Sequence, residues 1–134
     1  MAIWQVAINV ICKEKTIKYS DEKFQSSMKN LETTFLKENS WSKTIIQYGK
    51  LDSTCIEISL YNDIIDEISV RVDLQTISKE QLLIICNFIN ENNFLIEYDG
   101  EKNKANVDNF VKIFKKSGAY RFLTDPQQFL SQIN

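Results

Sequence analysis

Two runs of alternating apolar and polar residues, close together in the chain, constrain its fold most. They are "TCIEISLY" (54–61) and "EISVRVDL" (67–74), with the connection 62–66 between them. Alternation over this length is typical of strands that bury one face, and a short connection favours an antiparallel hairpin. The chain is therefore predicted to build an antiparallel sheet around this hairpin, with helices covering its apolar face.

The segments on either side of the hairpin carry helix and strand patterns in turn. Apolar residues recur at helical spacing after Ser20, which is predicted to cap that helix, and Ser78 with Gln81 forms a capping-box pattern before another apolar helical run. A third helical pattern begins near Val107. Strand patterns occupy residues 3–12, 44–48 and 93–98, and residues 99–104 read as an exposed turn or loop.

The order of these elements predicts the fold class. We expect a single α+β domain over residues 1–134, with a mainly antiparallel sheet of four to five strands and helices packed on one face. The order resembles a ferredoxin-like, split βαβ sandwich with an extra strand and a C-terminal helical extension. This architecture serves enzymes, binding modules and structural proteins alike, so it predicts no function.

The stretch "KKSGAYRFLTDPQQFL" (115–130) groups residues that end and begin helices. Gly118 is predicted to be the left-handed residue that ends the third helix, and Asp125 with Pro126 is predicted to begin a last one. These helix-ending and helix-starting roles do not involve Arg121, so its role stays open.

Several chemistries are excluded by composition. The chain has no histidine, which removes Ser-His-Asp and Cys-His catalysis and His-ligated zinc, and three glycines cannot form a phosphate-binding loop. The acidic cluster Asp63, Asp66 and Glu67 lacks the regular ligand spacing of a calcium loop and reads as a solvated hairpin tip. We therefore predict no catalytic residue, no metal site and no cofactor. A function other than catalysis is favoured, while carboxylate-based chemistry, which needs only Asp and Glu, stays open as an alternative.

Three cysteines and the N-terminal segment indicate a cellular compartment. Cys12, Cys55 and Cys86 are odd in number and far apart, which argues against a disulfide framework, and Cys55 is expected to be the most accessible thiol. The N-terminal segment lacks a basic leader, and no apolar run is long enough to span a membrane. The sequence therefore predicts a cytoplasmic protein without membrane association.

Charge is distributed unevenly along the chain. Residues 1–50 carry eight lysines and five acids, residues 51–101 carry eleven acids against Arg71 and Lys79, and residues 102–134 carry six bases against two acids. These segments sum to the net charge of −2, as +3, −9 and +4. A segment this acidic would repel phosphates, so direct binding of nucleic acid is not expected.

The alternation predicts an acidic sheet face on the side away from the helices. Its candidate partner-binding residues are Glu57, Tyr61, Arg71, Asp73 and Glu97. Such a face suits a basic protein partner. The alternative is a solvated face on which Arg71 pairs across strands with Glu57 or Asp73.

Three functions from different classes remain open at this point. The first is a non-catalytic protein-binding module, such as a bacterial immunity or antitoxin-like protein that covers a basic partner. The second is a small carboxylate-based enzyme or ligand-binding domain with a pocket near Arg71. The third is a self-associating structural subunit, because Phe122, Phe129 and Ile133 give the C-terminal tail apolar surface that needs its own core or another chain.

Overall fold

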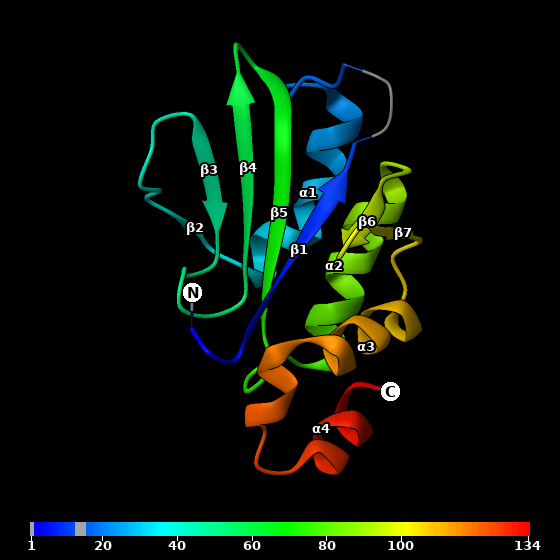
Figure 1. Ribbon diagram of the computed structural model, residues 1–134. Coiled ribbons are helices and arrows are strands. Elements are labelled where there is room, and N and C mark those ends of the chain that lie inside the picture. The colour runs from blue at the N-terminus through cyan, green and yellow to red at the C-terminus, as the bar shows by residue number, and fades with distance from the viewer. Residues whose placement is uncertain (1, 13–15) are drawn as a thin grey trace.

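The computed structural model describes residues 2–12 and 16–134, and these residues contain an antiparallel sheet of seven strands (Figure 1). The strands are β1 (Gln5–Ile11), β2 (Lys37–Glu38), β3 (Ile45–Tyr48), β4 (Cys55–Tyr61), β5 (Ile64–Asp73), β6 (Leu95–Tyr98) and β7 (Glu101–Asn103). Their order in space is β2-β3-β4-β5-β1-β6-β7. The α+β class is confirmed, but the sheet is wider than the predicted four to five strands.

Four α-helices and a short 3-10 helix accompany the sheet. The helices are α1 (Glu22–Thr34), α2 (Lys79–Glu91), α3 (Val107–Lys116) and α4 (Pro126–Ile133), with the 3-10 turn at Gly118–Phe122. Helices α1 and α2 pack side by side against one face of the sheet, behind it in Figure 1, while the opposite face faces the viewer without a helix over it. The C-terminal helices gather near one end of the sheet.

The hydrophobic core lies between the sheet and helices α1 and α2. In β1, Val6, Ile8 and Val10 alternate toward the helices, and each lies opposite an apolar residue of β5. From the helices, Phe24 of α1 meets Phe88 of α2 with ring centroids 5.7 Å apart in an edge-to-face arrangement. Aromatic rings in this geometry attract beyond the area they bury, so this pair ties the two helices together.

Side-chain caps explain where α1 and α2 begin. The predicted capping box of α2 is confirmed: Ser78 accepts a hydrogen bond from the backbone N–H of Gln81, whose side chain accepts one from the N–H of Ser78. The predicted cap of α1 is wrong by one residue, because Asp21 accepts the capping bond. Ser20 instead donates to the Asp63 carboxylate at 2.5 Å, which ties the start of α1 to the β4–β5 turn.

The β4–β5 hairpin is antiparallel, as predicted, but its turn is tighter than expected. Asn62 and Asp63 both have positive φ values, 49° and 67°, and form a two-residue turn of the kind that matches the twist of a hairpin. Asn and Asp tolerate this backbone region better than other residues with a side chain. A register shift after Ser59 absorbs the extra residue on β5.

Two short edge strands were not predicted from the sequence. Strand β2 has two residues and β7 has three, and residues 101–103 are all exposed. Such short, charged edges offer little backbone for another chain to pair with. With these additions, the ferredoxin-like order is not established for the whole sheet.

The C-terminal extension packs back on the protein. Asp125 accepts a capping bond from Gln128 and Pro126 begins α4, as predicted, while Phe129 and Ile133 are buried in the core. Gly118 is not left-handed: α3 ends at Ser117 in extended geometry, and a side chain at position 118 would meet open space. Helix α3 therefore ends because the chain turns into a 3-10 helix, in which Arg121 is exposed.

Candidate functional site

The face of the sheet that α1 and α2 leave uncovered, called the open face below, carries a polar row across all seven strands. The register of the six strand pairs aligns its members as Glu38, Gln47, Glu57, Ser69, Asn9, Glu97 and Lys102. Side chains opposite each other in such a row lie about 5 Å apart. The open face is therefore a continuous polar surface, in which Glu57 on β4 lies next to the middle strand β5.

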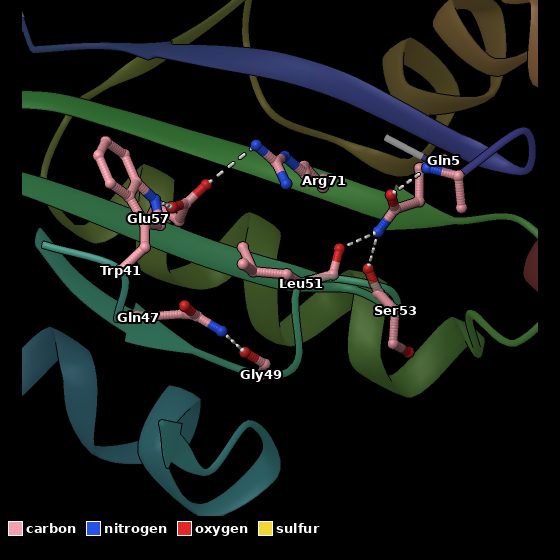
Figure 2. Close-up of polar contacts among 9 residues, drawn as sticks. Gln5, Trp41, Gln47, Gly49, Leu51, Ser53, Glu57 and Arg71 are labelled. Atoms are coloured by element: carbon pink, nitrogen blue, oxygen red, sulfur yellow. Dashed lines mark hydrogen bonds and ion pairs between the residues drawn. The ribbon is translucent and has the colours of Figure 1, made fainter. Parts of the chain in front are cut away.

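Glu57 is held from two sides. Its Oε1 lies 3.4 Å from the Arg71 guanidinium of β5, and its Oε2 accepts a hydrogen bond of 3.1 Å from the Trp41 indole N–H (Figure 2). Only 9% of the surface of Glu57 is exposed. A buried carboxylate needs such partners, because removing it from water is otherwise costly. This arrangement is the Arg71–Glu57 pairing that the sequence suggested for a solvated face.

Trp41 lies in the segment between β2 and β3 and is 71% exposed, although its N–H is engaged. Leu51, between β3 and β4, is 37% exposed and lies on the same side of the sheet in Figure 2. Trp41 contacts the Arg71–Glu57 pair through its hydrogen bond to Glu57. Tryptophan and arginine, here joined through one carboxylate, are among the residue types that most often dominate binding energy at protein interfaces.

Gln5 fixes the loop that carries Leu51. Its amide nitrogen donates to the backbone oxygens of Leu51 at 2.7 Å and Ser53 at 2.5 Å, and its amide oxygen accepts from the N–H of Ala2. Gly49 starts this loop with a φ of +84°, and a Cβ there would collide with the backbone of Thr54. The loop over this end of the open face is therefore set by a side-chain clamp and a tight backbone approach.

Of the predicted partner-binding residues, the structure brings Glu57 and Arg71 together and separates the others. Asp73 lies on the open-face side by register but is buried: its carboxylate accepts from the backbone N–H of Gln75 and from the Thr76 hydroxyl. These bonds shape the turn after β5. Asp73 is thus a structural residue of the turn, and its assignment to the binding surface is unsupported.

Tyr61 and Glu97 lie at the margins of the open face. Tyr61 is exposed at the tip of the β4–β5 hairpin, four residues from Glu57, or about 13 Å along the strand. Glu97 lies three strands away from Glu57 in the polar row, about 14 Å across the sheet, and faces Lys102 on β7. The predicted set therefore forms no single cluster.

The acidic residues of segment 51–101 are also more dispersed than an acidic face requires. Asp63 and Asp66 lie at the hairpin tip, Glu80 at the start of α2, and Glu101 pairs with Lys116 of α3 at 3.6 Å. On the open face, Glu57 is matched by Arg71. The charge asymmetry of the sequence does not translate into one strongly acidic surface.

The three cysteines are free thiols, and the expectation for Cys55 is wrong. Cys55 points to the open-face side of β4, yet it is fully buried. Burial, with a smaller contribution from Glu57 and a partial offset by Arg71, raises the pKa of the Cys55 thiol to about 11. Burial also raises the pKa of Cys12 to about 11 and that of Cys86 to about 12. Thiols of this kind are protonated near neutral pH and are poor nucleophiles.

Four surface hollows in the described part of the chain lie apart from the predicted partner-binding residues. Four hollows in the described part of the chain have volumes of about 150 to 510 Å³, and Arg71, Asp73 and Tyr61 line none of these four. The hollow of about 510 Å³ is lined by the Trp41 segment, with Lys37, Glu38 and Lys43 among its charged residues. Within residues 2–12 and 16–134, no three His, Cys, Asp or Glu side chains converge in a way that would hold a metal ion.

Sequence reasoning missed Trp41, Leu51 and Gln5. The signal for Trp41 was available: a lone tryptophan within the polar stretch "ENSWSKT" (38–44) has no apolar periodicity that would bury it. The roles of Leu51 and Gln5 depend on a loop that folds over the sheet, and no local pattern encodes that contact.

Comparisons with known proteins give no relative. The chain matches no family model, no curated protein and no solved structure. None of the helices in the described residues is long and apolar enough to cross a membrane. The function must therefore be argued from the open face itself.

Proposed function

We propose that this chain is a non-catalytic protein-binding module, of the immunity or antitoxin-like kind, that docks a partner on its open face around Trp41. The observation that carries the proposal is an exposed tryptophan whose indole N–H is bound by the buried carboxylate of an ion pair. Trp41 is 71% exposed, and the pair beneath it joins Glu57 to Arg71 at 3.4 Å. Tryptophan and arginine are enriched among the residues that dominate binding energy at interfaces.

Apolar surface around the ion pair supports this assignment. Trp41 and Leu51 are exposed apolar side chains on the same side of the sheet as Arg71 and Glu57, and the polar residues Asn9 and Ser69 lie on the same face by register. An apolar centre within a polar rim is the usual organisation of a protein interface.

We also propose that the partner is basic, and we base this on two carboxylates of the open face rather than on an acidic face as a whole. Glu67 and Glu97 lie on the open face by register, and in the described part of the chain neither carboxylate has a cation within 4 Å. Two such carboxylates steer a basic partner and affect its association rate more than its final affinity. We expect the double variant Glu67→Gln/Glu97→Gln to slow association and to weaken its salt dependence.

The two alternative functions draw less support from the geometry. A carboxylate enzyme or ligand-binding domain needs a pocket at Arg71, and Arg71 lines none of the four hollows. Self-association through the C-terminal tail was expected because its apolar residues need a partner. Phe129 and Ile133 are instead buried in the chain's own core, so they need no second chain. Light scattering after size-exclusion chromatography tests for a homo-oligomer directly.

Two further inferences accompany the proposal. Three free cysteines fit a reducing compartment, and we infer a cytoplasmic location for a single-domain protein. We also infer that the ferredoxin-like relationship concerns strands β4, β5, β1 and β6, which lie in that order in the middle of the sheet.

Quantitative affinity purification from cells that produce the protein tests the proposed function. The baits are the wild type, Trp41→Ala and a matched aromatic control, Phe122→Ala. Phe122 is 55% exposed and lies in the 3-10 helix, outside the sheet. The partner is the protein enriched by the wild type and the control, and calorimetry with the purified pair gives the dissociation constant.

We expect the dissociation constant to rise at least tenfold in Trp41→Ala, because truncation of an interface anchor costs more than about 1.4 kcal/mol. Phe122→Ala should change it by less than twofold. Equal binding by Trp41→Ala and the wild type would remove the open face from the interface and refute the proposal.

A further inference from the structure

The Trp41 side chain has an unusual combination of exposure and restraint. The residue is 71% exposed, but the only hydrogen-bond donor of its side chain is used internally, on Glu57 Oε2 at 3.1 Å. A tryptophan whose N–H is already engaged presents only its ring to a partner. The indole is thus fixed at its polar end while its apolar surface stays available.

The carboxylate that holds the indole is itself fixed. Glu57 divides its two oxygens, with Oε1 toward the Arg71 guanidinium and Oε2 toward the indole (Figure 2). Its cross-strand neighbours on the open face, Gln47 and Ser69, are uncharged. Arg71 is therefore the cation that balances and orients the carboxylate, and its position on β5 makes it part of the rigid sheet.

The segment around Trp41 has other internal hydrogen bonds, but they join its serine and threonine residues. The Ser40 hydroxyl donates to the backbone oxygen of Ser42, and the Ser42 hydroxyl lies 3.0 Å from that of Thr44. These bonds shape residues 40–44 without touching the indole. In the described residues, Glu57 supplies the hydrogen bond that fixes the Trp41 side chain.

From these contacts we propose that Glu57 and Arg71 are positioning residues, which hold the Trp41 indole in the pose that a partner recognises. The inference rests on the proposed function, because it assumes that Trp41 is a partner contact. Its physical basis is that a side chain ordered before binding loses less entropy on association. That loss is about 0.5–1.5 kcal/mol for a mobile side chain, or about 2- to 13-fold in the dissociation constant.

Fluorescence anisotropy decay tests the positioning step without a partner. A Trp4→Phe background leaves Trp41 as the single tryptophan, since the chain has two. In Glu57→Leu we expect the amplitude of the fast, sub-nanosecond component of Trp41 to rise at least twofold. Glu57→Gln keeps an amide oxygen as acceptor and should stay close to the background protein.

Two further variants separate positioning from damage to the fold. The double variant Glu57→Leu/Arg71→Leu replaces the ion pair by apolar groups, which often preserves stability, and it should show the same rise in mobility as Glu57→Leu. Glu67→Leu removes another carboxylate of the open face and should leave the anisotropy unchanged. Unaltered anisotropy in both Glu57→Leu and the double variant would overturn the proposal.

Affinity for the partner identified with the wild-type bait completes the test. We expect the dissociation constant to rise about 2- to 13-fold in Glu57→Leu and less than twofold in Glu57→Gln. If Trp41→Ala abolishes binding while Glu57→Leu binds like the wild type, the positioning inference fails and the proposed function stands. If Trp41→Ala binds normally, the proposed function fails whatever the anisotropy shows.

Discussion

The two faces of the sheet are built from the same strands but are covered by different means. On the helix side, β1, β4 and β5 present apolar residues, nearly all of them buried, to the core shared with α1 and α2. On the open face, the buried residues include Gln5, Gln47 and Glu57, and the Trp41 side chain and the loop at residues 50–54 contact this face. One face is closed by hydrophobic packing and the other is partly closed by hydrogen bonds.

Because of this difference, we expect the helix side of the sheet to determine stability and the open face to determine recognition. Apolar burial is not directional and contributes to stability in proportion to the area removed from water. Hydrogen bonds contribute little net stability but fix side chains in definite positions. We therefore expect substitutions on the helix side to unfold the protein, and substitutions on the open face to change what it presents to a partner.

The largest effect is expected for Phe88→Ala on the helix side. Phe88 is buried between Phe24 and Phe94, with ring centroids 5.7 and 6.5 Å away. Truncation leaves a cavity between α1, α2 and β6, so the free energy of unfolding should fall by about 3–5 kcal/mol. Urea denaturation followed by circular dichroism measures the change. A loss below 1 kcal/mol would show that the core does not depend on this aromatic contact.

A smaller effect concerns Cys55, a buried thiol on the open-face side. The folded state raises its pKa from 9.0 to about 11, chiefly by burial. Between these values the unfolded chain loses the proton first, so the free energy of unfolding falls as pH rises through this window. From pH 8 to pH 10.5, the contribution of this group amounts to a loss of the order of 2 kcal/mol.

Urea denaturation at both pH values measures this contribution against Cys55→Ala. The variant retains Cys12 and Cys86, whose raised pKa values act in the same direction. Its stability should therefore also decline at high pH, but less steeply than that of the wild type. Equal declines would indicate that the Cys55 thiol is as accessible to water as the sequence suggested.

The variant Gln5→Ala tests whether hydrogen bonds hold the loop at residues 50–54 over the open face. Gln5→Ala removes the donor to the backbone oxygens of Leu51 and Ser53, and should lower the free energy of unfolding by about 1–2 kcal/mol. Asn9→Ala is the matched control, because Asn9 lies on the same strand and face but is exposed. The control should change stability by less than about 0.5 kcal/mol. Similar effects of both substitutions, measured by urea denaturation, would contradict the clamp.

The sequence predicted the parts of the fold that local patterns encode. The alternation of β4 and β5 placed Glu57 and Arg71 on one face of a hairpin, and Ser78 with Gln81 marked the start of α2. The edge strands β2 and β7 were missed because two or three residues carry no period. They exist as strands only because β3 and β6 supply partners for pairing.

Alternation also gave the direction of a side chain without its environment. It assigned Cys55 and Asp73 correctly to the open-face side, but it could not show that loops and turns bury both. Trp41 had no assigned role because its hydrogen bond to Glu57 joins residues 16 positions apart. The candidate site was thus predictable as a sheet face, while its centre depends on contacts that only the folded chain forms.

The smallest effect on stability is expected for Trp41→Ala, and it is the sharpest test of the contrast between the two faces. Trp41 is large and apolar, as Phe88 is, but its ring is mostly in water in the folded state, so truncation exposes little new apolar surface. Glu57 loses one hydrogen bond and keeps Arg71. We expect a change of less than about 0.5 kcal/mol in the free energy of unfolding by urea denaturation. A loss near 2 kcal/mol would mean that the indole covers the sheet and stabilises the fold. The exposure of Trp41 would then not support a partner-binding role.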